Sequence, residues 1–198
     1  MSIEDLSKIL DDKLSKLDSK LDEALSKYGN VEKRLSTCES DIGHLLQRER
    51  GNNLRIIGLK IPTSPSPNVL TTADSVYKTL LEPIFQLALA EKILPVVPSL
   101  LESIDACHTI HTKKPEEIPP VHCRLRSKLL RDIIFTFKSR FFKANKLQYS
   151  IYEDLTPATR SLLRTTKERD DVESAWTRNG RVKFKLKSSQ VIQTARSF

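Results

Sequence analysis

Apolar residues in the first fifty positions recur at alternating spacings of three and four. The pattern runs from Ile3 to Leu45, and Ser7 is the one polar residue among its core positions. Spacing of this kind, sustained over this length, is typical of a coiled coil, in which helices bury the repeating face against one another. The residues that we expect to mediate oligomerisation are Leu10, Leu14, Leu17, Leu21, Tyr28, Val31, Leu35, Ile42 and Leu45, flanked by Arg34 and Glu39.

Charged residues beside this stripe are sorted by sign. In most heptads a basic residue, such as Lys27 or Arg34, precedes the first core position, and an acidic residue, such as Glu32 or Glu39, follows the second. In parallel helices these two positions face each other, so Lys27 can meet Glu32 of a neighbouring copy. The pattern therefore predicts a parallel homo-oligomer. The alternative is a long helix that packs on the rest of the chain.

The residues at the core positions indicate how many helices the coiled coil contains. Leucine at both core positions suits two strands as well as three. The segment from Arg34 to Glu39 has the form Arg–apolar–x–x–apolar–Glu, which is similar to a coiled-coil motif that favours trimers. Tyr28 at a core position also needs space that a trimer provides more easily. We expect a homotrimer, with a dimer as the alternative.

Residues after the coil alternate between strand patterns and helix patterns. Gly51-Asn52-Asn53 ends the coil, and Pro83 is expected to kink or divide the helix that follows. Strands are predicted at 54–59, 104–111, 121–126 and 148–152, helices at 71–94 and 127–142, and loops or links at 62–68, 95–102 and 113–120. The resulting order, β-α-β-β-α-β, is that of the ferredoxin-like fold, which RNA-recognition motif (RRM) domains share.

A smaller unit of one helix and one hairpin is predicted at the C-terminal end. Pro157 opens a helix that is expected to reach about Asp171. Asn179-Gly180, between predicted strands at 174–178 and 181–187, is a strong signal for a tight hairpin. The sequence therefore predicts an α+β protein with a coiled-coil segment at 1–50, an RRM-like domain at 53–153 and a basic C-terminal domain at 154–198.

The distribution of charge along the chain indicates what kind of partner it binds. The 198 residues include 33 Lys and Arg against 25 Asp and Glu, and residues 121–198 alone carry 18 basic and 7 acidic side chains, a net charge of +11. Such a segment favours polyanions, because each phosphate that it neutralises releases condensed counterions. The alternative is a basic protein with no role in nucleic-acid binding.

The outward positions of the predicted strands supply candidate contacts. Arg55 lies where RRM domains often carry a stacking aromatic residue, and His122, Arg124 and Arg126 alternate with the inward residues of the third strand. We expect this sheet to hold phosphates and stack guanidinium planes, with little reading of base edges. Further cations on the hairpin are expected to follow the phosphates: Arg178, Arg181, Lys183, Lys185 and Lys187. For the hairpin cations the alternative is a solubilising strand face.

Other chemistry finds little support in the residues. Cys107, His108, His111 and Cys123 lack a CxxC pair, and two histidines three apart on a strand point to opposite faces, so we expect no metal site. Glu153-Asp154 has no phosphate-binding glycine loop or nucleophile motif beside it. We therefore expect these carboxylates to form ion pairs at a domain junction, and we expect no enzyme activity and no cofactor.

The sequence also indicates the cellular compartment in which we expect the protein. No run of about 18 apolar residues is present, so no membrane span is expected. The N-terminal segment is amphipathic and acidic, unlike a secretory signal. Three cysteines cannot build a disulfide framework, which fits the cytosol or the nucleus.

Six segments carry a resemblance to a known family. They are NLRIIGL (53–59), IDACHTIHTKKP (104–115), PPVHCRLRS (119–127), RDIIFTFKSR (131–140), YEDLTPATRSLLR (152–164) and AWTRNGRVKFK (175–185). In this order and spacing, behind a coiled coil, the chain resembles the first-open-reading-frame protein of LINE-type non-LTR retrotransposons. It departs from the family in a long, proline-rich stretch at 60–102 and in HTIH, which replaces a more basic stretch.

The resemblance implies a self-associating, non-enzymatic protein that binds single-stranded RNA. Such a protein coats its own transcript into a ribonucleoprotein particle, acts as a nucleic-acid chaperone during reverse transcription, and is expected in cytoplasmic particles, with the nucleus left open. Arg164 matches a basic position on the helix of the family's C-terminal domain, and Arg160 lies one turn earlier. With Arg124, Arg126 and the cations of 181–187, these residues are expected to line a cleft between the two domains. For Arg164 the alternative is a solvated helix residue.

The sequence is compatible with three functions. The first is the RNA-binding protein, with single-stranded DNA as a second ligand. The second is a coiled-coil scaffold with a C-terminal domain that binds protein, and the third is a protein that binds duplex DNA.

Overall fold

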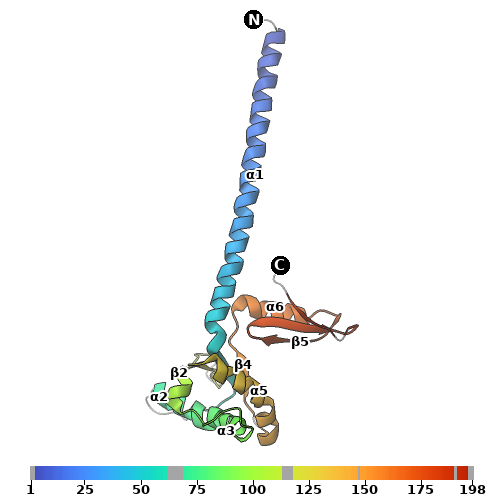
Figure 1. Cartoon of the computed structure of the whole chain (residues 1–198). Coiled ribbons are helices and arrows are strands. Elements are labelled where there is room, and N and C mark those ends of the chain that lie inside the picture. The colour runs from blue at the N-terminus through green and yellow to red at the C-terminus, as the bar shows by residue number, and fades with distance from the viewer. Residues whose placement is uncertain (1–2, 62–68, 113–117, 147, 190, 196–198) are drawn as a thin grey trace. The chain divides into compact units, whose positions relative to one another are not determined.

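The computed structural model describes residues 3–61, 69–112, 118–146, 148–189 and 191–195. These residues form an α+β protein in which a long N-terminal helix is followed by antiparallel sheets and helices (Figure 1). The chain divides into two compact units, Met1–Leu45 and Leu46–Phe198. The loops predicted at 62–68 and at 113–117 lie outside the described residues.

The first unit is helical throughout its described length. Helix α1 (Ile3–Glu49) covers nearly all of the segment that the sequence predicts as helical, 1–50, and its last four residues belong to the second unit. The predicted core residues from Leu10 to Leu45 form an apolar stripe. In a single copy, each large apolar residue of this stripe is between 54% and 72% exposed. Lys16 pairs with Asp12 at 2.7 Å and Lys27 pairs with Glu23 at 2.6 Å within the helix. Association of the stripe with other copies stays a prediction.

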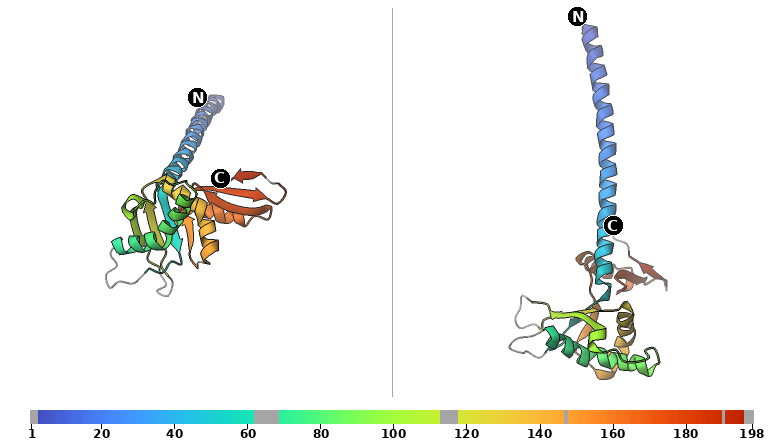
Figure 2. Two further views of the ribbon diagram at one scale, coloured as in Figure 1. Left: turned by 60° about the horizontal axis from the view of Figure 1, so that its bottom comes forward. Right: turned by 60° about the vertical axis from the view of Figure 1, so that its left-hand side comes forward.

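The second unit contains a four-stranded antiparallel sheet. Its strands are β1 (Asn53–Ile57), β2 (Ile104–Thr109), β3 (Val121–Leu125) and β4 (Ser150–Glu153), in the spatial order β2-β3-β1-β4. The helices that pack on this sheet gather on one of its faces (Figures 1 and 2), and they are α2 (Val69–Val76), the π-helical turn η2 (Tyr77–Leu81), α3 (Glu82–Ala90) and α5 (Lys128–Asn145).

The core forms between the sheet and these helices. Leu54 and Ile56 on β1 and Val121 and Cys123 on β3 are fully buried, which confirms the predicted inward positions of the third strand. Phe85 from α3 is also fully buried and belongs to the same cluster. Because side chains alternate along a strand, the residues between these face the side of the sheet that these helices do not cover.

Pro83 divides its helix, as the sequence predicts. Proline lacks the N–H that would bond to the carbonyl of residue 79, and its ring crowds that carbonyl. Here the chain widens into the π-helical turn η2 before Pro83 opens α3. The Tyr149 hydroxyl donates to the Thr79 carbonyl at 3.1 Å. A side chain from another element therefore supplies the bond that proline cannot.

The C-terminal part is a helix on a three-stranded sheet. Its elements are α6 (Pro157–Lys167), β5 (Val172–Arg178), β6 (Arg181–Leu186) and β7 (Ile192–Thr194), with β6 in the middle. The prediction that the helix reaches Asp171 is wrong, because Val172 is buried and pairs with Leu186, and the Asp171 carbonyl accepts from Lys187 N at 2.9 Å. Strand β7 was not predicted, and its residues are exposed.

Two short helices and several boundaries also differ from the sequence prediction. A 3-10 turn, η1 (Arg50–Asn52), follows α1, and α4 (Leu100–Ser103) begins inside the predicted link, where the Ser99 hydroxyl accepts from Glu102 N. The third strand stops before Arg126, because Arg126 N donates to the Ser103 carbonyl and α5 begins two residues later. The remaining strands and helices overlap their predicted ranges with shifts of a few residues.

The hairpin turn is held by one carboxylate from the first sheet. Asn179 and Gly180 have φ of 55° and 71°, the positive values that a tight two-residue hairpin needs. The Glu153 carboxylate accepts from Asn179 N at 2.7 Å and from Gly180 N at 3.1 Å. It also pairs with Arg131, which donates to the Asn179 side chain at 2.6 Å. The side chains of Arg131 and Glu153 are only 3% and 7% exposed.

This pair generates a stability prediction. Glu153→Ala leaves the buried Arg131 charge unpaired and frees the hairpin turn, so we expect the free energy of unfolding to fall by about 3–5 kcal/mol. The matched control is Glu91→Ala, which breaks an exposed pair with Arg140 and should cost at most about 1 kcal/mol. Urea unfolding of both variants measures the difference, and equal losses would contradict the role given to Glu153.

Candidate nucleic-acid interface

The face of the four-stranded sheet away from its helices collects cationic and imidazole side chains. Pairing between strands sets Arg55 on β1 beside His122 on β3, and His122 beside His108 on β2. The two imidazole rings lie 5.0 Å apart between centroids, with a tilt of 41°. Arg124 lies two residues further along β3 on the same face. Strand register therefore brings together residues that are far apart in the sequence.

A hollow of about 400 Å³ opens on this face. Residues from α1, η1, three strands of the sheet and the start of α6 surround it. Its lining residues are Glu49, Arg50, Asn53, Arg55, His108, Ile110, His122, Arg124, Asp154 and Arg160. Four arginines and two histidines against two carboxylates give the hollow a cationic character.

Asp154 organises the floor of the hollow. Its carboxylate accepts from Arg50 at 3.2 Å and from Asn53 at 3.3 Å, and it lies 3.4 Å from Nε2 of His122. Burial raises the pKa of Asp154, but the hydrogen bonds from His122 and Asn53 and the charge of Arg50 outweigh burial, so the pKa lies below its usual value. Asp154 therefore stays ionised and fixes its three partners.

The cations of the hollow differ in their partners. Arg50 pairs with the buried Asp154, and Arg124 pairs with Asp105 at 3.3 Å in a half-exposed pair. Arg55 forms no ion pair within the described part of the chain, and its Nε is buried there without a hydrogen-bond partner. The guanidinium of Arg160 donates only to the Leu155 carbonyl, at 3.4 Å, among the residues that the structure describes. Arg55 and Arg160 are therefore the cations most available to a phosphate.

Of the predicted contact residues, Arg55, His122, Arg124 and Arg160 line the hollow. The others lie elsewhere in the second unit: Arg126 just past β3, Arg164 on α6, Arg178 at the end of β5, Arg181, Lys183 and Lys185 on β6, and Lys187 after it. A cleft that includes both groups stays a prediction.

The cationic row on β6 has the predicted alternation. Val182 and Phe184 are buried, and Lys183 and Lys185 point to the other side. The row is less uniformly positive than the sequence suggests, because Lys185 pairs with Glu173 on β5 at 2.8 Å. Trp176 lies directly opposite Lys183 in the pairing and so shares its face.

The sequence does not predict three residues of these surfaces as nucleic-acid contacts: Arg50, His108 and Trp176. From the sequence, Arg50 belongs to the end of the coil, and His108 is a candidate only for a metal ligand. Trp176 is half-buried on the Lys183 face. No spacing signal in the sequence reveals these positions, because the pairing register decides which residues share a face.

The cysteines and the histidines of β2 and β3 lie on opposite faces of the sheet. Cys107 and Cys123 pair across β2 and β3 and are buried in the core, whereas His108 and His122 face the other way. A hydrogen bond with Cys107 and burial raise the pKa of the Cys123 thiol. Within the described ranges no group of three or more His, Cys, Asp or Glu residues could hold a metal ion.

The predicted ion-pair role of Glu153 and Asp154 is confirmed. Glu153 pairs with Arg131 and Asp154 with Arg50, so both carboxylates serve contacts inside the protein.

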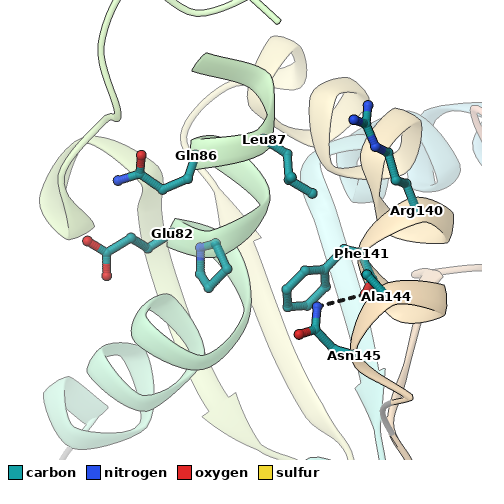
Figure 3. A pocket seen from close by; sticks show the side chains of 8 residues that line it. Glu82, Gln86, Leu87, Arg140, Phe141, Ala144 and Asn145 are labelled. Atoms are coloured by element: carbon teal, nitrogen blue, oxygen red, sulfur yellow. Dashed lines mark hydrogen bonds between the residues drawn. The ribbon is translucent and has the colours of Figure 1, made fainter. Parts of the chain in front are cut away.

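A second hollow of about 510 Å³ lies between α3 and α5 (Figure 3). Leu87 and Phe141 face each other across it, and Asn145 donates to the Phe141 carbonyl at 2.9 Å. Among its described lining residues, Arg140 is the one cation, and it pairs with Glu91. This hollow is mainly apolar and lacks the charge that a polyanion site needs.

No protein-family model and no curated protein matches this chain. Among its described residues, no helix is both long enough and apolar enough to span a bilayer.

The pKa of Asp154 leads to a test of its structural role. A group whose pKa is lowered by folding contributes stability above its unfolded pKa, about 3.9 for aspartate, and that stability is lost as the pH falls through the folded value. Asp154→Asn should therefore destabilise the protein at pH 7, and its difference from wild type should shrink as the pH drops below about 4.

The control for this test is Asp74→Asn on α2, which removes an exposed pair with Lys78 on η2. It should change the free energy of unfolding little at either pH. Chemical unfolding at pH 7 and near pH 3 measures both variants. A difference for Asp154→Asn that stays constant over this range would show that its charge does not stabilise the fold.

Proposed function

We propose that this chain is a non-enzymatic protein that binds single-stranded nucleic acid, with RNA as its main ligand. The observation that carries the proposal is the cationic hollow on the open face of the sheet, where Arg55, Arg124 and Arg160 converge beside two histidines. Guanidinium groups suit phosphates, and planar side chains on an open sheet suit unpaired bases.

The arrangement of the sheet supports an RRM-like, ferredoxin-like domain. Its elements follow the order β-α-β-β-α-β when α2, η2 and α3 count as one helical segment and the short helices η1 and α4 are left out, and its strands lie in the order β2-β3-β1-β4. The helices cover one face and leave the other to the hollow. In RRM domains it is this open face that binds RNA.

The family resemblance extends the proposal. We assign the chain the role of a LINE-type first-open-reading-frame protein that coats element RNA into a cytoplasmic ribonucleoprotein particle and acts as a chaperone in retrotransposition. The excess charge of residues 121–198 supports binding along the length of a polyanion rather than at one sequence. The two alternatives remain the protein-binding scaffold and the duplex-DNA-binding protein.

The proposal predicts a charge-dependent affinity. Arg55→Ala should weaken single-stranded RNA binding and reduce the slope of log affinity against log salt by about 0.7, because one phosphate contact is lost. Filter binding of single-stranded and duplex RNA and DNA at several salt concentrations measures this. A preference for duplex DNA would favour the duplex-binding alternative, and no salt-dependent retention would favour the scaffold.

The matched control is Lys78→Ala, which removes an exposed cation from η2 on the helical side of the sheet. Its slope should equal that of the wild type. The same assay sorts Arg126 and Arg164, since alanine at a true contact lowers the slope and alanine at a solvated residue does not.

We propose further that α1 forms a parallel coiled coil, with a trimer favoured over a dimer. Support comes from the apolar stripe, whose large members are more than half exposed in a single copy. Joining several heads raises the affinity for a long strand, because the second contact becomes intramolecular.

Leu21→Asp should separate the copies, because it places a charge in the shared core. We expect sedimentation of the full chain to show a monomer, and the affinity for long RNA to fall while that for a short oligonucleotide holds. Ser19→Asp, on the outer face of the same helix, is the control and should stay oligomeric. A wild-type chain that sediments as a monomer would contradict the coiled coil.

A further inference from the structure

One side chain at the end of α1 holds the connector, residues 154–156, that joins β4 to α6. The side-chain amide of Gln47 donates to the Asp154 carbonyl at 3.1 Å and accepts from Thr156 N at 3.0 Å. The connector residues Asp154, Leu155 and Thr156 are all buried. Buried backbone groups need hydrogen-bond partners because water does not reach them, and Gln47 supplies one at each end of the connector.

The side chain of Gln47 is itself confined. It lies so close to the hairpin turn that a Cβ added at Gly180 would be 2.5 Å from Cγ of Gln47. In the apolar repeat of α1, Gln47 takes the position farthest from the stripe that contains Ile42 and Leu45. Gln47 therefore contacts the connector and the turn from a side of α1 that association of the helices does not use.

The connector determines where α6 begins and hence where its first cation lies. The Thr156 side chain caps the helix, and the Arg160 guanidinium, one turn later, donates to the Leu155 carbonyl at 3.4 Å. Arg160 lines the hollow together with Arg55 and Arg124, which come from the sheet. A shift of the connector would therefore move Arg160 away from the arginines of the sheet.

We propose that Gln47 is a positioning residue for nucleic-acid binding: by holding the connector, it keeps Arg160 at the hollow with the arginines of the sheet. Gln47 is not among the described residues that line the hollow, so it acts through the connector and not on the ligand. A cation that is already in place loses less conformational freedom when it meets a phosphate. This inference rests on the proposed function, and it gives the end of α1 a part in the affinity of each head.

A double-mutant cycle tests the coupling between Gln47 and Arg160. The full chain and its variants Gln47→Ala, Arg160→Ala and the double variant are titrated with an oligouridylate of roughly eight nucleotides, which fits the site of one head. Fluorescence anisotropy at several salt concentrations gives the affinity and its salt slope, and urea unfolding checks that each variant is folded. The matched control is Gln86→Ala, which removes an exposed glutamine side chain from α3.

Arg160→Ala should weaken binding about tenfold and lower the slope of log affinity against log salt by about 0.7, because one phosphate contact is lost. Gln47→Ala removes no charge, yet it should lower the slope by a similar amount, because Arg160 no longer meets the phosphate. The double variant should bind like Arg160→Ala alone. Gln86→Ala should match the wild type in affinity and slope.

A second variant, Gln47→Met, separates hydrogen bonding from packing, and it carries the test if Gln47→Ala fails to fold. Methionine keeps the length of the side chain beside Gly180 but cannot bond to the connector. Its salt slope should therefore fall as far as that expected for Gln47→Ala.

Three results would overturn the positioning role. One is a wild-type salt slope in both Gln47→Ala and Gln47→Met, and another is losses from Gln47→Ala and Arg160→Ala that add in the double variant. The third is a slope that Arg160→Ala leaves unchanged, because Gln47 would then have no contact to position. In all three cases the wild type still binds, so the proposed function stands. A wild type that does not bind the oligouridylate at low salt would remove the proposed function itself.

Discussion

Two adjacent carboxylates at the end of β4 fix the geometry of the second unit. Successive residues of an extended chain point to opposite faces, so Glu153 turns toward Arg131 and the hairpin, while Asp154 turns toward Arg50 and His122. One strand end therefore ties the sheet to the turn of the β5–β6 hairpin on one side and to η1 on the other. Without this junction, the hollow would lose its floor.

The same junction explains why a site for a polyanion contains a buried acid. Asp154 removes one unit of positive charge from the hollow, which weakens long-range attraction for phosphates. In return it orients Arg50 and His122, whose side chains would otherwise lose conformational entropy on binding. Arg55 and Arg160 have no such partner in the described structure, so the hollow combines fixed cations with free ones.

The sequence predicted features that depend on near neighbours, and missed those that depend on register. The apolar spacing that predicts a long helix, the Asn179-Gly180 turn and the division at Pro83 are local signals, and the structure contains the helix, the turn and the division, whereas association into a coiled coil stays a prediction. The end of α6 depends instead on the pairing of Val172 with Leu186, and the approach of Arg55, His122 and His108 depends on how β1, β3 and β2 align. Alternation indicates which face a residue takes, but only pairing sets its neighbours.

Under the proposed function, the exposed apolar stripe of α1 and the cationic hollow on the sheet serve one purpose. In a single copy, the large apolar residues of the stripe from Leu10 to Leu45 are more than half exposed, and this is unfavourable because burying apolar area is the main source of stability. A shallow, half-neutralised hollow is equally poor as a lone site for a flexible polymer. Several heads on one coil resolve both problems, since each added contact along the same strand acts at a high effective concentration. Weak contacts at each head also let the strand exchange, as a chaperone requires.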